Sequence, residues 1–507
     1  MDYNLKFQNL KMKGMYCYKC LLIGFLLLVN MLNAQEISAR VIDSKSQEPV
    51  AFATIKTGKN KGVITNGEGL FVIDTAYIEN KNVQISCMGY TTKSVPLSSI
   101  AEGASIALEP ALNQLETVFL SSSTPNVDAI IEKVNQNYFT NYRSDSLTYK
   151  FFKRFTTYGD FESIDLEIDK SSEFSKVEVK KSNQELSAIS NEIKNSNSIS
   201  FDESRGKLLK LDSTNSKLRI DKVTKIFNSG EQFSIEAIEA KSVDVVLKYL
   251  DTTQTYKLKT GWFTVEDELS LNSERNEDKE ANDSVTVKDE KSEILSILNG
   301  EYLNSESTLK SILDTDIYEY ELENASIYDD ELIYEISFSP KRSRAKYKGT
   351  IYVSDDTFAI LKMNYDFAKG KRGDKLNLKL ILGIKYIENL NEGTMIFSKA
   401  AEGFYVPKYL GSSTGSYFYA KRPFKFIENS AAKNKTAMTL KLEGQLNTKT
   451  ELLFETVEPL EFQAFESTDQ VEQVKIESLR KYDANQWTGS QTLAPTEELR
   501  KFEATEK

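Results

Sequence analysis

The 507-residue sequence contains no histidine. Catalytic zinc centres hold their metal largely through histidine, and Ser-His-Asp and Cys-His mechanisms use it as the general base. The zinc carboxypeptidases and the histidine-dependent triads are therefore excluded by composition. Paired carboxylates can hydrolyse a glycosidic bond without histidine, so a carboxylate-dependent glycan or peptide hydrolase remains an alternative. We predict no catalytic residue, no cofactor and no metal site, because the 75 Asp and Glu residues are typical of solvated surface charge.

Cysteine is almost as scarce, with three residues in the whole sequence. Cys17 and Cys20 precede an apolar run near the N-terminus, and Cys87 lies in a strand-like segment between Ile85 and Met88. A mature chain cut after that run keeps only Cys87 and cannot form an intramolecular disulfide. A lone cysteine among apolar residues is usually a buried thiol, which is our prediction for Cys87.

The sequence also has no excess of positive charge, because its formal net charge is −11. Binding to nucleic acid needs a basic surface that neutralises phosphates, so nucleic acid is excluded as a partner. The negative charge is concentrated between Thr264 and Glu293, where eleven Asp and Glu face four Lys and Arg. With few apolar residues, this stretch is predicted to be an acidic flexible linker over residues 264–293.

The N-terminus predicts export. Four lysines (Lys6, Lys11, Lys13 and Lys19) precede the apolar run Leu21–Leu32, which is followed by the small residue Ala34. This order is that of a signal peptide, here residues 1–34. The apolar run is shorter than the roughly 20 residues that span a bilayer, so we expect no transmembrane segment after cleavage.

Residues 35–120 have the pattern of a small β-sandwich. Short β-rich runs alternate with glycine turns, as in Gly62-Val-Ile-Thr-Asn-Gly-Glu-Gly-Leu-Phe71 and Ser86-Cys-Met-Gly-Tyr90. Asn66-Gly67 between Val63-Ile64 and Leu70-Phe71 predicts a β-hairpin, because Asn-Gly accepts the positive φ of a tight turn. Residues 113–120 are predicted to form a further strand.

Residues 126–263 form a mixed α/β segment in this interpretation. Thr124-Pro125 predicts a helix start, with Thr124 as the N-cap and proline at the first helical position. The helix carries an apolar stripe that we expect to face the core: Val127, Ile130, Ile131, Val134 and Tyr138. Leu147–Phe155 follows as a strand, and Leu186, Ile189 and Ile193 indicate a surface helix.

Residues 294–507 are rich in alternating β patterns and are predicted to be continuous with residues 126–263. Leu361, Met363, Tyr365 and Phe367 recur with period two, which predicts a strand with one buried face. A longer strand is expected from the alternating apolar residues between Leu376 and Tyr386, followed by a turn at Asn389–Gly393. The fold class is therefore mainly β, or α+β overall, with a curved antiparallel sheet and flanking helices behind the sandwich.

The first domain resembles the carboxypeptidase regulatory-like family, a transthyretin-like β-sandwich. The resemblance rests on these residues: Val41, Asp43, Pro49-Val50, Ala53-Thr54-Ile55, Thr65-Asn66-Gly67-Glu68-Gly69-Leu70-Phe71, Gly89-Tyr90 and Leu108. In that family such positions are structural. The remainder is similar to Gram-negative envelope proteins of unknown function, through Tyr347–Ile360 and the ending Tyr482-Asp-Ala-Asn-Gln-Trp487 among other stretches. This likeness implies a location in the periplasm or at the outer membrane.

Aromatic residues of the second β-rich region are the candidates for ligand contact. They are Phe397, Phe404, Tyr405, Tyr409, Tyr417 and Tyr419. Such residues can line an apolar or sugar-binding cradle, although aromatic residues more often fill the core of a sheet. We therefore predict a non-catalytic exported envelope protein that binds or scaffolds an envelope protein or a lipid or glycan ligand. A carrier of an apolar ligand or lipid on a half-barrel sheet is the other alternative.

Overall fold

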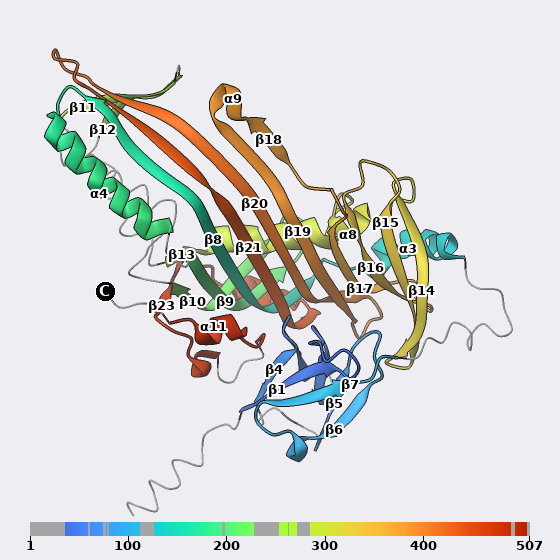
Figure 1. Cartoon of the computed structure of the whole chain (residues 1–507). Helices are drawn as coiled ribbons and strands as arrows, with labels where there is room; N and C mark the ends of the chain where they lie inside the picture. Colours follow the sequence, from blue (N-terminus) through green and yellow to red (C-terminus); the bar gives the residue numbers. More distant parts are fainter. Residues whose placement is uncertain are drawn as a thin grey trace, which may run out of the picture. The chain divides into compact units, whose positions relative to one another are not determined.

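The structure is a computed structural model that describes residues 36–58, 61–74, 78, 81–111, 126–194, 198–227, 253–261, 263–270, 284–487 and 492–503. The predicted signal peptide and the predicted strand over residues 113–120 lie outside the described residues. The chain divides into two compact units. The smaller unit holds the N-terminal β-rich region, and the larger unit holds most of the chain from Pro110 onward (Figure 1).

The smaller unit is built from two sheets, with strand orders β4-β1-β7 and β3-β2-β5-β6. Its strands are β1 (Glu36–Asp43), β2 (Thr54–Gly58), β3 (Lys61–Ile64), β4 (Leu70–Asp74), β5 (Asn82–Ser86), β6 (Lys93–Pro96) and β7 (Ala104–Leu108). Val41, Ile55, Phe71 and Val83 come from different strands and are fully buried. Cys87 is a buried free thiol, as predicted.

The predicted Asn66-Gly67 hairpin is wrong. β3 pairs with β2 and β4 pairs with β1, so the turn connects two different sheets. The side-chain oxygen of Asn66 accepts hydrogen bonds from the amides of Glu68 and Leu70, and the positive φ of 72° falls on Gly69. The turn residues therefore stabilise a connection between two sheets. An Asn-Gly pair is compatible with such a connection as well as with a hairpin, so the motif alone does not tell them apart.

A segment from the far end of the chain belongs to the smaller unit. Trp487, Leu493 and Ala494 are buried there. The side-chain amide of Asn66 donates to the carbonyl oxygen of Ala494 at 3.3 Å. No hydrophobic periodicity predicted that this C-terminal segment would pack with the β-sandwich.

The larger unit is organised by one curved sheet whose main path runs β14-β15-β16-β17-β19-β20-β21-β8-β9-β10-β23. The strands before residue 300 are β8 (Leu147–Ser171), β9 (Ser198–Lys210), β10 (Ser216–Phe227), β11 (Thr255–Thr260), β12 (Phe263–Ser270) and β13 (Ser284–Thr286). Those after it are β14 (Tyr318–Tyr328), β15 (Glu331–Pro340), β16 (Tyr347–Ser354), β17 (Ile360–Phe367), β18 (Lys375–Leu378), β19 (Ile384–Lys399), β20 (Tyr405–Glu428), β21 (Lys435–Pro459), β22 (Gln473–Lys475) and β23 (Glu477–Leu479).

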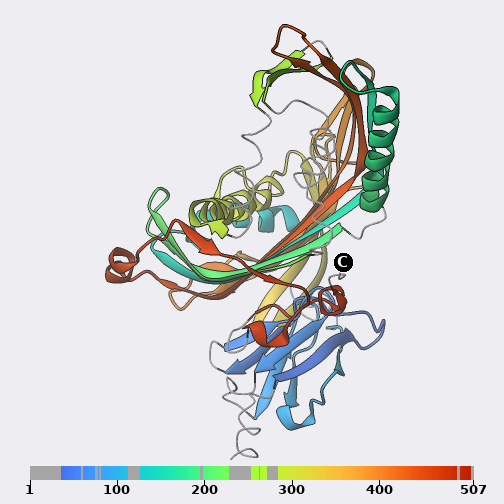
Figure 2. The same ribbon diagram turned by 90° about the vertical axis from the view of Figure 1, so that its left-hand side faces the viewer.

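Helices cover part of the concave side of this sheet (Figure 2). The helical elements of the unit are α3 (Val127–Asn141), α4 (Lys176–Lys194), α7 (Val287–Leu298), the π-helical turn η5 (Asn299–Leu303), α8 (Thr308–Ser311), α9 (Lys379–Leu382), α10 (Phe462–Ser467), η6 (Ala484–Trp487) and α11 (Glu497–Lys501). Of these, α3, α7, η5 and α8 contribute to the main core. None of the helices in the described ranges has the length and apolar character needed to cross a membrane.

The predicted apolar stripe of α3 is confirmed, since Ile130, Ile131, Val134 and Tyr138 are buried. The predicted cap is wrong, because the helix begins at Val127 and the side chain of Asn126 accepts the amide hydrogen of Asp128. Asparagine is as good an N-cap as threonine. The apolar stripe therefore predicted the position of the helix, but the residues of its first turn were predicted wrongly.

α4 lies beside the upper half of β8 (Figure 1). β8 pairs with β21 along its whole length but with β9 only as far as Gly159. Beyond that point, the side chain of Asn183 in α4 accepts from the amide of Ile168 at 2.8 Å and donates to its carbonyl oxygen at 3.1 Å. Asn183 thus satisfies backbone groups at an edge that would otherwise be open to another strand.

Several predicted boundaries in the larger unit are corrected by the structure. The long strand expected from Leu376 to Tyr386 is a hairpin, because α9 interrupts it and Gly383 turns the chain with a φ of 67°. The expected turn at Asn389–Gly393 is part of β19, which absorbs Asn389 as a β-bulge. Alternation alone cannot distinguish one strand from two strands that meet at an apolar turn.

The acidic linker predicted over residues 264–293 is wrong at both ends. Residues 264–270 belong to β12, and residues 284–293 form β13 and the start of α7. Asp289 and Glu290 lie in the first turn of α7, where negative charge favours the helix dipole. Residues 271–283 lie outside the described residues.

Candidate functional site

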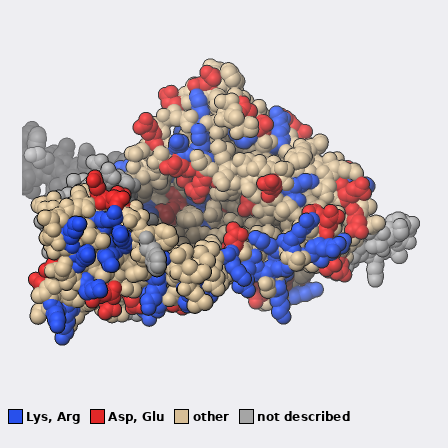
Figure 3. All heavy atoms as spheres, turned by 90° about the horizontal axis from the view of Figure 1, so that it is seen from above, with Lys and Arg blue, Asp and Glu red and all other residues tan. Residues whose placement is uncertain are grey.

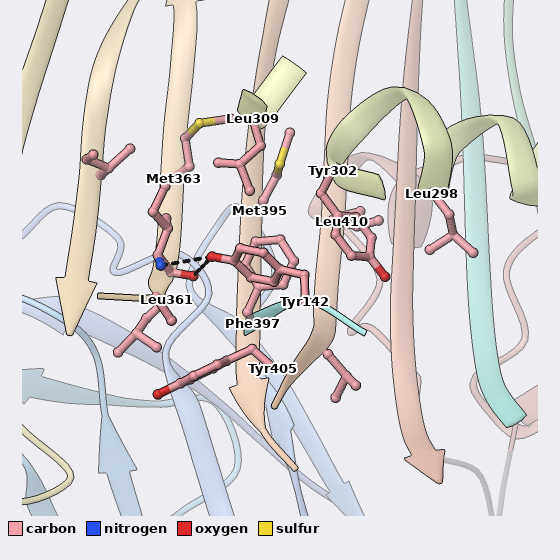
Figure 4. Packing of buried hydrophobic residues seen from close by; sticks show 14 of the residues in the cluster. Tyr142, Leu298, Tyr302, Leu309, Leu361, Met363, Met395, Phe397, Tyr405 and Leu410 are labelled. Atoms are coloured by element: carbon pink, nitrogen blue, oxygen red, sulfur yellow. Dashed lines mark hydrogen bonds between the residues drawn. The ribbon is translucent and has the colours of Figure 1, made fainter. Parts of the chain in front are cut away.

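Three of the six candidate aromatic residues belong to the helix-covered core. Phe397 is buried, with its ring centroid 4.9 Å from that of Tyr142 and 5.2 Å from that of Tyr302 (Figure 4). Tyr405 is also buried, and its hydroxyl lies 2.9 Å from Oγ1 of Thr357. Phe404 is partly buried and packs against the same core. The structure therefore uses these three side chains for packing.

The other three candidates point to the opposite face of the sheet. Tyr409, Tyr417 and Tyr419 alternate along β20 in unbroken register with β21, whereas Leu410 points into the helix-covered core. Tyr409 is buried and donates to Glu451 at 3.3 Å. Its phenol is thus held in a buried polar network, whereas Tyr417 lines a surface depression.

That depression, which we call the cup, encloses about 400 Å³ on this face. It is lined by Gly370, Lys371, Arg372, Lys385, Ile387, Asn389, Tyr417 and Gln445. The loop before β18 supplies two of the cations and β19 supplies the third, while β20 and β21 supply the floor. The sheet therefore brings together side chains that are up to 75 positions apart in the sequence.

The three cations of the cup make contacts other than salt bridges within the described residues. Lys385 Nζ lies 4.8 Å from the centroid of the Tyr417 ring, and Lys371 Nζ donates to the carbonyl oxygen of Ser343 at 2.8 Å. Within the described residues, neither lysine nor the exposed Arg372 forms an ion pair with a carboxylate. Positive charge and N–H donors beside an aromatic ring suit a polar ligand that carries a phosphate, sulfate or carboxylate group.

The polar floor of the cup is held in place by its own hydrogen bonds. The side-chain amides of Asn389 and Gln445 bond to each other in both directions, at 3.0 and 2.8 Å. Tyr417 donates to Glu443 at 2.5 Å, and this hydrogen bond raises the pKa of the phenol to about 12. The ring of Tyr417 is thereby fixed as a neutral surface beneath Lys385. A site with a fixed floor loses less entropy when a ligand binds.

Sequence reasoning missed the cationic residues of the cup. A signal was present, because residues 369–385 contain six Lys and Arg against one Asp. That signal was hidden by the net charge of −11. The space-filling view from above shows Lys and Arg side chains gathered in patches despite the negative net charge (Figure 3).

A second chemically distinct group is the carboxyl of Glu301, in η5. Burial raises its pKa to about 7, and the hydroxyl of Tyr365 lies 3.5 Å from its Oε2. A carboxyl with a raised pKa is what a general acid requires. Among the described residues, no group of three or more Cys, Asp or Glu side chains is arranged to hold a metal ion.

Buried ion pairs elsewhere in the sheet are structural. Arg154 and Glu203 are almost fully buried and their charged atoms lie 2.7 Å apart, with Glu451 at 3.9 Å from the same guanidinium. Lys153 Nζ lies 2.8 Å from carboxylate oxygens of both Glu290 and Glu293 and thereby ties α7 to β8. Each of these charges has a partner, so they leave no free group for chemistry.

Comparison with known proteins separates two regions of the chain. Residues 37–120 match the model of the CarboxypepD_reg-like domain, and residues 315–422 match a family of unknown function, DUF5686. The second match runs from just before β14 into β20 and includes the cationic loop of the cup. None of the curated proteins matches the sequence.

Solved structures give only weak similarity. A proposed outer membrane lipoprotein-sorting protein domain from Vibrio parahaemolyticus is 10% identical, with a TM-score of 0.21, over 67% of this chain and 97% of that chain. A DUF1329 family protein from Desulfovibrio piger is 11% identical, with a TM-score of 0.17, over 67% and 97%. A proposed membrane-associated protein of unknown function from Bacteroides fragilis is 9% identical, with a TM-score of 0.12, over 82% and 98%. TM-scores this low carry no argument about this chain.

The family matches confirm the resemblance of the N-terminal region and extend it to the large sheet. In the CarboxypepD_reg-like region, the quoted turn and core positions are structural in this chain as well, as Asn66 and Phe71 illustrate. The chain therefore carries an N-terminal CarboxypepD_reg-like domain followed by a domain of the family of unknown function DUF5686.

Proposed function

We propose that this chain is an exported, non-catalytic protein of the cell envelope that binds an anionic ligand in the cup. The observation that carries the proposal is the group of three cations around Tyr417, which form no salt bridge in the described part of the chain. The predicted signal peptide and the CarboxypepD_reg-like domain support the envelope location. Phosphorylated or carboxylated glycans and lipid headgroups are the anionic ligands of that setting.

The carrier alternative gains less support from the structure. An acyl chain held against the concave side would have to occupy the region where α3, η5 and α8 pack on the sheet. There Tyr142, Tyr302 and Phe397 are in mutual contact and buried. Lipid that co-purifies with the mature chain, detected by native mass spectrometry, would favour the carrier over the cup.

The hydrolase alternative has one specific observation in its favour, the raised pKa of Glu301. A glycosidase also needs a second carboxyl about 5 to 10 Å away across a cleft. Turnover of a chromogenic glycoside or peptide that is abolished by Glu301→Gln would support this alternative. The same result would contradict the proposal that the protein is non-catalytic.

The cup is tested with a glucosamine disaccharide bisphosphate that carries no acyl chains, titrated into the mature chain and followed by calorimetry. We expect binding that weakens as salt is raised, because exposed charges are screened. The double variant Arg372→Glu, Lys385→Glu should lose binding by at least about tenfold, which corresponds to about 1.4 kcal/mol. The unphosphorylated disaccharide should bind less tightly than the bisphosphate.

The matched control is Lys180→Glu, Lys181→Glu on the exposed surface of α4, which changes the net charge by the same amount. It should bind the bisphosphate like the wild type. If both double variants weaken binding equally, only the overall charge matters and the cup is not the site. Absence of binding by the wild type would equally contradict the proposal.

A further inference from the structure

Two turns of the larger unit meet end to end along one edge of β20. β19 pairs with β20 up to Ala420, which lies opposite Ile384, and β11 pairs with the same edge from Phe424 onward. The turn before β19 is α9, and the turn after β11 leads through Gly261 to β12. Figure 1 shows both turns at the upper end of the sheet.

The three residues between these pairings hold the two turns together. Arg422 donates from Nη1 to the carbonyl oxygen of Leu382 at 2.8 Å and from Nε to Oγ1 of Thr260 at 3.2 Å. The amide of Lys421 donates to Gly383 at 2.7 Å, and that of Gly261 donates to Pro423 at 3.3 Å. The spacing of α9 and the β11–β12 turn is therefore fixed by hydrogen bonds from both sides of Arg422.

Large apolar side chains project into solvent from α9 and from the start of β12. Leu380 and Ile381 of α9 are 101% and 80% exposed, and Phe263 and Val265 of β12 are 59% and 57% exposed. We call these four side chains the apolar edge. Single exposed apolar residues are normal, whereas a group of them marks an interaction site. Leu380 and Ile381 are adjacent at the end of a hairpin, so neither can be covered by its own strand.

Lysines lie near the apolar edge on α9, β18 and β20, whereas β12 carries the exposed Glu266, Asp267 and Glu268 beside Val265, with Asp267 2.5 Å from Lys257. Lys375, Lys379, Lys421 and Lys425 are exposed, and none of them forms an ion pair within the described part of the chain. Lys259 of β11 lies directly opposite Lys425 of β20 in the pairing register. Like charges in that position are destabilising, unless an anion from outside the protein lies between them.

An anionic lipid surface fits both features. Interfacial binding elements place apolar side chains at the boundary of the acyl region while lysines meet lipid phosphates. Here Leu380 and Ile381 lie at the end of the β18–β19 hairpin, Phe263 and Val265 lie at the start of β12, and lysines lie nearby on α9, β18, β20 and β11. A protein partner with an acidic surface would account for the lysines, but large apolar side chains that project into solvent beside them fit the acyl boundary of a bilayer interface better.

We propose that the apolar edge docks the large unit onto an anionic phospholipid bilayer, with Leu380, Ile381, Phe263 and Val265 entering the interface. Lys259, Lys421 and Lys425 would contact lipid phosphates, which relieves the repulsion between Lys259 and Lys425. The inference rests on the envelope location proposed above. It concerns residues other than those that line the cup, although both groups draw on the β18–β19 hairpin, so each proposal can fail alone.

Flotation of the mature chain with vesicles tests the docking. The wild type should float with phosphatidylglycerol-rich vesicles and remain with the soluble fraction when the vesicles are pure phosphatidylcholine. The double variant Leu380→Ser, Ile381→Ser should lose at least about tenfold in vesicle affinity, because it removes two large side chains from the apolar edge. Lys425→Glu should weaken binding to anionic vesicles. Both variants change exposed positions and should leave the unfolding transition unchanged.

The matched control is Val177→Ser, at another exposed apolar position (77%) on α4, which should bind vesicles like the wild type. Loss of vesicle binding by Leu380→Ser, Ile381→Ser with intact binding of the disaccharide bisphosphate supports the docking proposal separately from the cup. Vesicle binding that depends on Arg372 and Lys385 but not on Leu380 and Ile381 would overturn it. The proposal would also be overturned if the wild type does not bind anionic vesicles, or if it forms dimers through Leu380 and Ile381.

Discussion

The phenol of Tyr142 holds both backbone groups of Ile360. Its hydroxyl donates to the carbonyl oxygen of Ile360 and accepts from the amide of the same residue, each at 2.8 Å (Figure 4). Tyr142 caps the C-terminal end of α3, and Ile360 is the first residue of β17, next to a β-bulge. One buried side chain thus joins a helix to a strand where the regular ladder is interrupted.

Tyr142→Phe should therefore destabilise the larger unit although it removes a single oxygen. The substitution leaves a buried N–H and a buried C=O without this partner, and an unsatisfied buried group costs about 1 to 3 kcal/mol. We expect a loss of about 2 to 4 kcal/mol in the free energy of unfolding, measured by urea denaturation. Tyr386→Phe, which removes the same oxygen from an exposed ring, should change it by less than about 0.5 kcal/mol.

Periodicity predicted those elements in which one face is buried in a continuous core. The stripe of α3 and the alternation in β17 are examples, since the buried positions repeat without interruption. It failed where apolar residues serve a turn, as at Leu380, and where polar residues serve a strand, as at Asn389. A prediction from hydropathy assumes that apolar residues are buried and that polar residues lie in turns. Leu380 is apolar but exposed, and Asn389 is polar but lies within a strand.

The candidate site was predictable only in part for a related reason. Tyr417 was identified from the density of aromatic residues, but the same criterion selected Phe397, which lies in the core. β20 places side chains on alternate faces, and a bulge near Pro407 changes the alternation. The face of each aromatic residue therefore depends on a register that a single sequence does not contain.

Phe397 and Tyr417 should consequently respond differently to substitution. Phe397→Ala should cost about 3 to 5 kcal/mol in the free energy of unfolding, because a buried ring is replaced by a cavity. Tyr417→Ala should cost less than about 1 kcal/mol and should instead weaken binding of the disaccharide bisphosphate. Urea denaturation and calorimetry on both variants give the two readouts. A stable Phe397→Ala protein with lost ligand binding would show that Phe397 contacts ligand.

Glu301 should make stability depend on pH in a defined window. Its pKa is raised from the ordinary 4.5 to about 7 by burial, so the folded chain binds this proton more tightly than the unfolded chain. Stability from this group is complete below about pH 4.5 and is lost as the pH rises toward 7. The loss amounts to roughly 1 to 3 kcal/mol, since each pKa unit corresponds to about 1.4 kcal/mol and the side chain is half-buried.

Glu301→Gln removes the ionisation and keeps the shape. The variant should match the wild type near pH 4 and be more stable near pH 8, where the wild type carries a poorly solvated carboxylate. Urea denaturation from pH 4 to pH 8 gives the difference curve, which should rise across the window and then become flat. Glu306→Gln, at an exposed position nearby, is the control for the Glu-to-Gln substitution itself. A flat curve for Glu301→Gln would mean that the carboxylate finds compensation in the folded chain, and the hydrolase alternative would then lose its general acid.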